Sequence, residues 1–193
     1  MLIFSPNPKA RGFSLIELIV VIAIIGILAS LAIPSYTAWI QNNKIRTAAE
    51  SIQNGIQMAR GEAVKQNASV QFDFRGTNSA WTVCTSPAAP GACPDPDDAT
   101  TVQSRAATEG SSADITLVTS DVGPFVFNSF GVMTSPVPAA ASGLVTIDVD
   151  VDTSVLSAAE SRELRIVIGV GGSVRVCDPA LDTAGTDPRK CPA

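Results

Sequence analysis

The feature that most constrains this chain is an uninterrupted apolar run near its amino terminus. Residues 13–33 read FSLIELIVVIAIIGILASLAI, and Glu17 is the only charged residue among them. A helix of this length rises about 30 Å, which matches the hydrocarbon core of a bilayer. Lys9 and Arg11 precede the run, and basic residues stay on the cytoplasmic side of a membrane helix. The run therefore predicts one membrane-spanning helix with the carboxy-terminal bulk on the opposite side.

A cleaved secretory signal is the competing interpretation, with Ser30-Leu31-Ala32 as its small-x-small cleavage site. Signal h-regions span about 7–15 residues and rarely contain a carboxylate, so the length of the run and the presence of Glu17 favour a retained anchor. A carboxylate inside a bilayer is costly unless it reaches a cationic partner. We expect that the partner of Glu17 is a free α-amino group at the amino terminus of another chain.

The segment Gly12-Phe13-Ser14-Leu15-Ile16-Glu17 resembles the class III signal of type IV pilins and pseudopilins. That signal is a short basic leader that ends in Gly, followed by Phe and by Glu as the fifth residue of the mature chain. The resemblance implies cleavage between Gly12 and Phe13 by a prepilin peptidase, N-methylation of Phe13, and pairing of Glu17 with the amino terminus of a neighbouring subunit. It also implies that Pro34 kinks or loosens the helix.

After Pro34 an amphipathic helical pattern continues to about Gln66. The apolar stripe at the spacing i, i+3, i+4, i+7 consists of Ile45, Ala48, Ala49, Ile52, Ile56, Ala59 and Ala63. This stripe is expected to pack against a sheet made by the residues that follow. Asn67 is predicted to end the helix, and Gly55 and Gly61 are interpreted as positions of close packing.

From Ser69 onward the hydrophobic period changes from helical spacing to two, which is typical of strands. Further strands are predicted at about 80–84, 114–119, 124–130, 143–151, 163–170 and 173–177. Residues 76–79 and 169–172 are interpreted as turns, and residues 87–101 and 135–142 as exposed loops. Short strands after one long helix predict an α+β fold with an antiparallel head.

Several motifs in the head resemble the GspH/FimT family of minor pilins and pseudopilins. They are ARGEAVKQN at 59–67, FNSFG at 127–131, RIVIG at 165–169, GSVRVCDP at 172–179 and DPRKC at 187–191. The resemblance implies a long pilin helix packed on an antiparallel β-sheet head. Its parts would be a leader peptide (1–12), a transmembrane helix (13–34), an amphipathic helical half (35–67) and a β-rich periplasmic head (68–193). The tail between Arg175 and Cys191 favours the FimT/FimU-like members over secretion pseudopilin H.

The four cysteines suit an oxidising compartment such as the periplasm. They are Cys84, Cys93, Cys177 and Cys191, and three disulfide connectivities are possible. Pairing of sequence neighbours, Cys84 with Cys93 and Cys177 with Cys191, would close loops of ordinary size and is the expected arrangement. Zinc binding is disfavoured because the chain has no C-x-x-C pair and no histidine.

Composition excludes most enzyme classes. The absence of histidine removes Ser-His and Cys-His catalysis as well as histidine-based metal sites. Asp148, Asp150 and Asp152 share one strand face, but a calcium loop that starts at Asp148 would need glycine where Thr153 stands and a bidentate carboxylate where Ala159 stands. We therefore predict no catalytic residue, no metal site and no cofactor.

Three functions from different classes are compatible with these features. The preferred one is a non-enzymatic minor pilin that takes part in initiating or assembling a type IV pilus. It would sit in the bacterial inner membrane with a periplasmic head and contact lipid, other minor and major pilins or pseudopilins, prepilin peptidase and the inner-membrane assembly platform. The alternatives are a DNA-binding minor pilin for natural transformation and minor pseudopilin H of a type II protein secretion system.

DNA capture ranks lower because the tail carries little net positive charge. DNA-binding members of the family carry G-R-x-R in this tail, whereas here the first arginine is replaced by Ser173. Arg175, Arg189 and Lys190 are the candidate DNA contacts. Residues 162–193 hold five basic and four acidic residues, a net charge of +1, and the whole chain has a net charge of −5. Phosphate binding normally needs several clustered cations.

Overall fold

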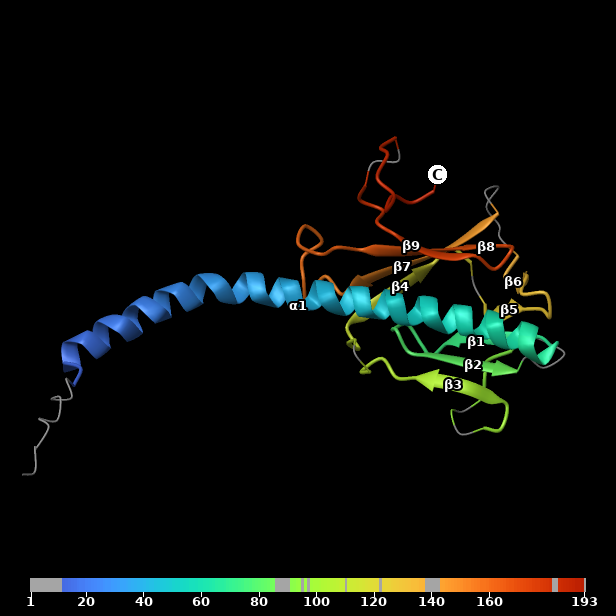
Figure 1. Ribbon diagram of the computed structural model, residues 1–193, viewed down its shortest axis with the longest axis horizontal. Helices are drawn as coiled ribbons and strands as arrows, with labels where there is room; N and C mark the ends of the chain where they lie inside the picture. Colours follow the sequence, from blue (N-terminus) through green and yellow to red (C-terminus); the bar gives the residue numbers. More distant parts are fainter. Residues whose placement is uncertain are drawn as a thin grey trace, which may run out of the picture. The chain divides into compact units, whose positions relative to one another are not determined.

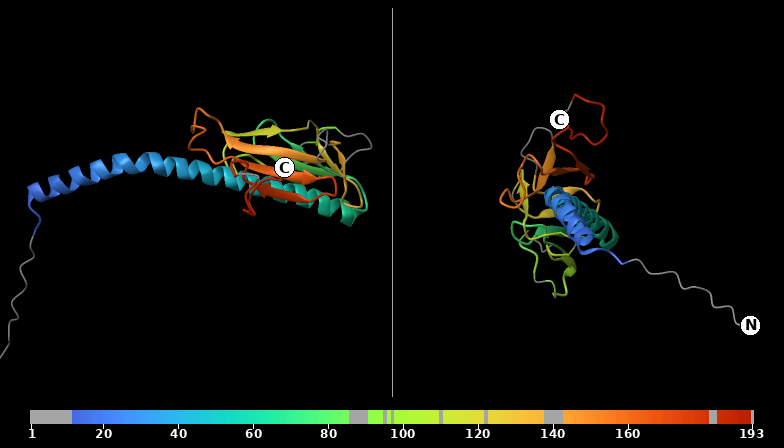
Figure 2. Two further views of the ribbon diagram at one scale, coloured as in Figure 1. Left: turned by 90° about the horizontal axis from the view of Figure 1, so that it is seen from above. Right: turned by 90° about the vertical axis from the view of Figure 1, so that its left-hand side faces the viewer.

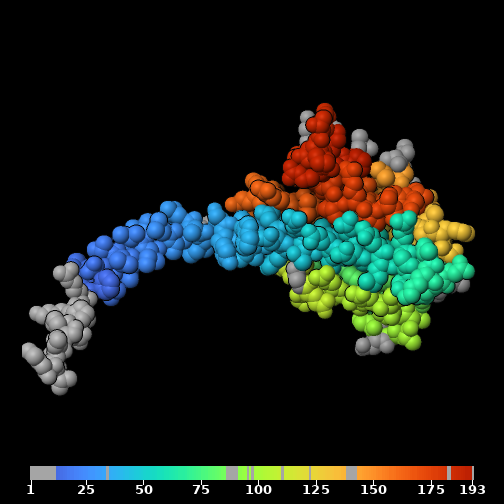
Figure 3. Space-filling view, viewed as in Figure 1, coloured from blue at the N-terminus to red at the C-terminus, as the bar shows by residue number. Residues whose placement is uncertain are grey.

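The computed structural model divides the chain into two compact units, Met1–Thr37 and Ala38–Ala193 (Figure 1). It describes residues 12–85, 91–94, 96, 98–109, 111–121, 123–137, 143–181 and 184–192. Lys9, Arg11 and the rest of the expected leader before Gly12 lie outside the described residues, as does the side chain of Pro34. In the first unit, the described residues from Leu15 onward form the first part of helix α1 (Leu15–Gln66), and the side chains of residues 13–33 are all exposed (Figure 3).

Helix α1 runs through position 34 and ends where the sequence predicts. Asn67 has a φ of 51°, a left-handed conformation that asparagine tolerates better than most residues. The Asn67 N–H donates to the Val64 carbonyl (3.3 Å) and the Ala68 N–H to the Ala63 carbonyl (3.2 Å). These two bonds form a Schellman motif, which satisfies carbonyls at the helix end and turns the chain into the first strand.

Nine strands follow α1 in the part of the chain that the structure describes. They are β1 (Val70–Phe74), β2 (Trp81–Thr85), β3 (Thr101–Arg105), β4 (Ile115–Thr119), β5 (Phe125–Phe127), β6 (Met133–Ser135), β7 (Leu144–Val151), β8 (Leu164–Gly169) and β9 (Val174–Cys177). They form a five-stranded sheet in the order β3-β2-β1-β5-β6 and a four-stranded sheet in the order β4-β7-β8-β9. Neighbouring strands pair antiparallel throughout, so the predicted α+β class with an antiparallel head is confirmed.

The head half of α1 packs on both sheets, with β7–β9 on one flank and β1–β3 on the other (Figures 1 and 2). All seven residues of the predicted apolar stripe are fully buried. They share one core with side chains from both sheets, among them Phe72, Phe125, Ile147 and Ile166. On β7 buried residues alternate with partly exposed ones, so Asp148 and Asp150 stand on the outer face of their sheet. Burial of this stripe is the main force that holds α1 to the head.

Backbone hydrogen bonds also join the two sheets at their edges. The Leu117 N–H of β4 donates to the carbonyl of Thr77, in the turn between β1 and β2 (3.3 Å). The Met133 N–H of β6 donates to the carbonyl of Val170, in the turn between β8 and β9 (2.9 Å). Each bond occupies part of a strand edge that would otherwise expose unpaired backbone groups.

The structure corrects the sequence interpretation at three places. Strands β3 and β6 were not expected, and Thr101 and Ser135, assigned to loops, belong to them. Close packing is confirmed at Gly55, where an added Cβ would lie 2.7 Å from the Phe72 ring. It is wrong at Gly61, where an added Cβ would meet no atom of another segment within 4 Å. The strands were missed because β3 is polar and β6 has only three residues, so neither shows a clear period of two.

Candidate functional site

The candidate site at the start of α1 is built by Ser14 and Glu17. The Glu17 N–H donates to Ser14 Oγ (3.2 Å), and the Ser14 N–H donates to Glu17 Oε2 (3.5 Å). This reciprocal pair is a capping box, which satisfies two of the backbone N–H groups that a helix start leaves without partners. Within one chain the Glu17 carboxylate therefore caps its own helix.

Sequence reasoning missed this use of Glu17, although the signal was present. Ser14-x-x-Glu17 has the spacing of a capping box, and it directly precedes an apolar helical run. Phe13 is 86% exposed, and the following side chains up to Ile33 are also exposed. A carboxylate and a bare apolar surface thus stand together at the start of α1, where a neighbouring chain could cover both.

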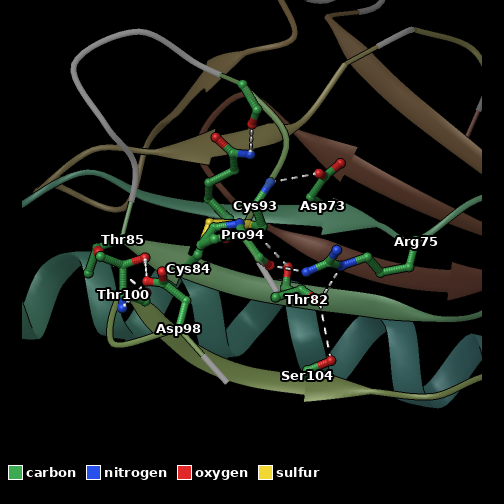
Figure 4. The surroundings of a disulfide bond; sticks show 12 residues. Asp73, Arg75, Thr82, Cys84, Thr85, Cys93, Pro94, Asp98, Thr100 and Ser104 are labelled. Carbon is green, nitrogen blue, oxygen red and sulfur yellow. Dashed lines mark hydrogen bonds between the residues drawn. A yellow bond between two sulfur atoms is a disulfide. The ribbon is translucent and has the colours of Figure 1, made fainter. Parts of the chain in front are cut away.

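The disulfide between Cys84 and Cys93 fastens a loop to the five-stranded sheet (Figure 4). The Cys93 N–H donates to Asp73 Oδ2 (3.1 Å), and Arg75 donates to the Pro94 carbonyl and to Thr82 Oγ1. Asp73 lies on β1, Arg75 directly follows β1, and Thr82 lies on β2, so these contacts hold the segment around Cys93 in addition to the covalent bond. The role of this disulfide is structural, since both cysteines are buried.

The second disulfide joins Cys177 at the end of β9 to Cys191 in the tail. With Val167, the two cysteines form a small buried cluster separate from the main core. The Asp178 N–H also donates to the Arg189 carbonyl (2.8 Å). The bond and this contact hold the tail against the four-stranded sheet.

The folded tail brings two of the candidate DNA contacts together and pairs the third with an acid. Arg175 donates to the backbone carbonyl of Lys190, and Lys190 Nζ donates to the carbonyl of Gly185 (2.5 Å). Arg189 binds both carboxylate oxygens of Asp187, at 3.1 and 2.8 Å. These hydrogen bonds lower the pKa of Asp187 from 3.8 to about 2, so the carboxylate stays charged at neutral pH and offsets Arg189.

Acidic groups also lie beside β8, the strand that pairs with β9. Arg165 is paired with Asp148 (2.9 Å). The pKa of Glu163 is raised by its partial burial and by the carboxylates of Asp148 and Asp150, although Arg165 opposes this. The carboxylates of Asp148, Asp150 and Glu163 place negative charge beside this strand, which Arg165 offsets only in part, and negative charge repels phosphate.

We therefore expect the purified chain to bind duplex DNA weakly or not at all near 0.15 M salt, about the physiological ionic strength. Fluorescence anisotropy of a labelled duplex measures this. Asp187→Asn, which leaves Arg189 without its anion, should strengthen any residual salt-sensitive binding, and Arg175→Ala should weaken it. Tight binding at this salt concentration that is lost in Arg175→Ala would make DNA capture the leading function.

A comparison with protein-family models identifies the family of this chain. A protein-family model described as type II transport protein GspH matches residues 48–172, well over half of the chain. The chain belongs to the GspH family. A second model, described as the prokaryotic N-terminal methylation motif, matches residues 7–33, the stretch that contains Gly12, Phe13 and Glu17. Both matches confirm the resemblance that the sequence motifs indicated.

A solved structure has a fold similar to that of this GspH-family chain. The type IV minor pilin FimU of Pseudomonas aeruginosa (strain PAO1) aligns with a TM-score of 0.50 at 16% identity, over 72% of this chain and 91% of that chain. An identity this low shows the fold alone, which is pilin-like.

Curated relatives of this GspH-family chain match over shorter stretches. The type IV major pilin protein PilA of Myxococcus xanthus is 67% identical over 30 residues, which are 16% of this chain and 14% of PilA. A fimbrial protein of Neisseria meningitidis serogroup B is 37% identical over 82 residues, which are 42% of this chain and 44% of that protein. This chain therefore spans less than half the length of these two relatives.

Proposed function

We propose that this GspH-family chain is a minor pilin, a non-enzymatic subunit that takes part in initiating or assembling a type IV pilus. In this proposal, prepilin peptidase cleaves after Gly12, Phe13 is N-methylated, and the α1 segment up to Pro34 anchors the subunit in the bacterial inner membrane. The head lies in the periplasm until the subunit joins other pilins through the inner-membrane assembly platform.

The observation that carries the proposal is the exposed amino-terminal part of α1. Residues 13–33 include fourteen large apolar side chains that are about half exposed or more, at 47–86%. An apolar surface of this extent needs lipid or protein to cover it. A neighbouring pilin helix would cover it in a filament, and its amino terminus would supply the cation that Glu17 needs once water is excluded. The two family-model matches and the pilin-like fold support this role.

Deletion of the gene tests the function. We expect the number of surface pili to fall sharply, while secretion of type II substrates and DNA uptake remain near the parental level unless they depend on the same pili. Complementation with the intact gene should restore piliation. Loss of secretion with normal piliation would instead identify a pseudopilin, which shares the anchor but serves a secretion system.

Processing gives a second, independent check. The mature chain should begin at Phe13 and carry one methyl group on its α-amino nitrogen. Loss of Lys9 and Arg11 would leave eleven basic and eighteen acidic side chains, a net side-chain charge of −7. Mass spectrometry of the intact protein from membranes measures both changes. A chain that begins near Ile33 would show cleavage of an ordinary secretory signal and would contradict the pilin proposal.

A further inference from the structure

Two aromatic side chains stand exposed on α1 just beyond the apolar run. Tyr36 is 61% exposed and Trp39 is 60% exposed, whereas Trp81, the second tryptophan of the chain, is 2% exposed. Tyrosine and tryptophan are enriched at interfaces and in membrane-interface belts, where one end of the ring meets an apolar phase and the other meets water. The core already described does not include either side chain.

The positions of these residues along α1 match a layer of the membrane. Tyr36 lies three residues and Trp39 six residues beyond Ile33, the last residue of the apolar run. The polar layer of a bilayer is about 5–8 Å thick on each side, or about three to five residues of helix. Side chains of a helix lean toward its amino terminus, so the Trp39 ring covers the turn before its own Cα. Both rings therefore reach the polar layer when the apolar run fills the hydrocarbon core.

The chemistry of the two rings fits that layer as well. Tyrosine and tryptophan have an apolar body and one polar group, and they are enriched where the hydrocarbon core meets the headgroups. Lys44 follows on the same helix and forms no ion pair with any residue that the structure describes. A cation placed just outside the headgroups is attracted by anionic lipid across about one Debye length.

We propose that Trp39 and Tyr36 bind the headgroup layer of the periplasmic leaflet and so fix the depth of α1 in the membrane before the subunit is assembled. The inference rests on the membrane anchoring proposed above and names its second point of attachment. The partner is the interfacial layer of a phospholipid bilayer, where the apolar body and the polar group of each ring are both accommodated.

Tryptophan fluorescence tests the proposal on the full chain in vesicles of phosphatidylethanolamine and phosphatidylglycerol. Trp39→Phe is the matched control, because it leaves Trp81 as the only tryptophan, which is excited selectively at 295 nm or above, and it changes an exposed site. Trp81 is buried, and its indole N–H donates to Ser51 Oγ (2.9 Å), so lipid-borne quenchers should not reach it. The difference between the two proteins is the emission of Trp39.

The expected result is strong loss of the Trp39 emission with lipids brominated near the carbonyl groups, and a smaller loss with lipids brominated near the chain ends. Iodide in the aqueous phase should quench Trp39 less than it quenches free tryptophan. Quenching by iodide without quenching by either brominated lipid would place Trp39 in water and overturn the inference. Stronger quenching from the chain ends would place it in the hydrocarbon core and overturn it as well.

Flotation of the same vesicles on a density gradient separates this inference from the anchoring on which it rests. A chain that floats with the vesicles but shows no lipid quenching of Trp39 leaves the anchor intact and contradicts only the interfacial contact. A chain that fails to float contradicts both.

Discussion

Replacement of Gly172 by alanine is expected to lower the free energy of unfolding by roughly 2–5 kcal/mol. Gly172 has a φ of 75°, a conformation that costs a residue with a Cβ atom about 1–2 kcal/mol. Its added Cβ would also lie 2.2 Å from the Gly131 carbonyl oxygen and 2.8 Å from Arg60 Nε. The turn between β8 and β9 would then have to separate from the turn between β5 and β6.

The neighbouring glycine gives a matched control for this prediction. Gly171 has no atom within 4 Å of the position of an added Cβ, so Gly171→Ala should change stability by no more than about 0.5 kcal/mol. Chemical denaturation of the detergent-solubilised chain, followed by tryptophan fluorescence, compares the two variants. Equal stability of both variants would show that the two turns are not in contact.

The second large effect is expected at Glu17. If its charge pairs with the amino terminus of a neighbouring subunit, Glu17→Ala should leave the protein folded and membrane-bound but scarce in pili. A pair that contributes about 1.4 kcal/mol corresponds to a tenfold loss of incorporation. The ratio of subunit in sheared filaments to subunit in membranes, measured by immunoblot, gives this quantity.

The capping box makes two further variants informative. Glu17→Gln keeps an acceptor for the Ser14 N–H but removes the charge, so it should assemble as poorly as Glu17→Ala. Ser14→Ala keeps the charge and removes the hydroxyl that caps the helix, which should cost only about 1 kcal/mol of helix stability. Near-normal incorporation of Glu17→Gln would show that the carboxylate acts as a cap and that its charge is not needed for assembly.

Much of the fold follows from local patterns in the sequence. The apolar stripe from Ile45 to Ala63 repeats at helical spacing because one side of the helix faces a core, and each of its residues is buried. Asn67 ends the helix because it accepts a left-handed backbone. The alternation on β7 reflects a strand with one buried face. Each of these signals is carried by residues close together in the chain.

The site at the start of α1 was only partly predictable. Glu17 stands out in the sequence because it is charged within an apolar run. Its hydrogen bonds with Ser14 are equally local and could have been predicted from their spacing. The neighbouring chain whose amino terminus would pair with Glu17 cannot be identified from this pattern, because a pattern within one chain carries no information about its neighbour.

The sequence by itself determined the anchor, the amphipathic half of α1, most of the strands and the family resemblance, since these depend on periodicity and short motifs. Only the tertiary structure decided which cysteines pair, that Asp187 neutralises Arg189, that β3 and β6 complete their sheet, and that Gly172 faces Gly131. The pairing of the cysteines and the contacts of β3, β6 and Gly172 join segments with no common local pattern. The Arg189 contact is near in sequence, but it depends on how the tail folds against β9. Such contacts are selected by the packing of the whole head.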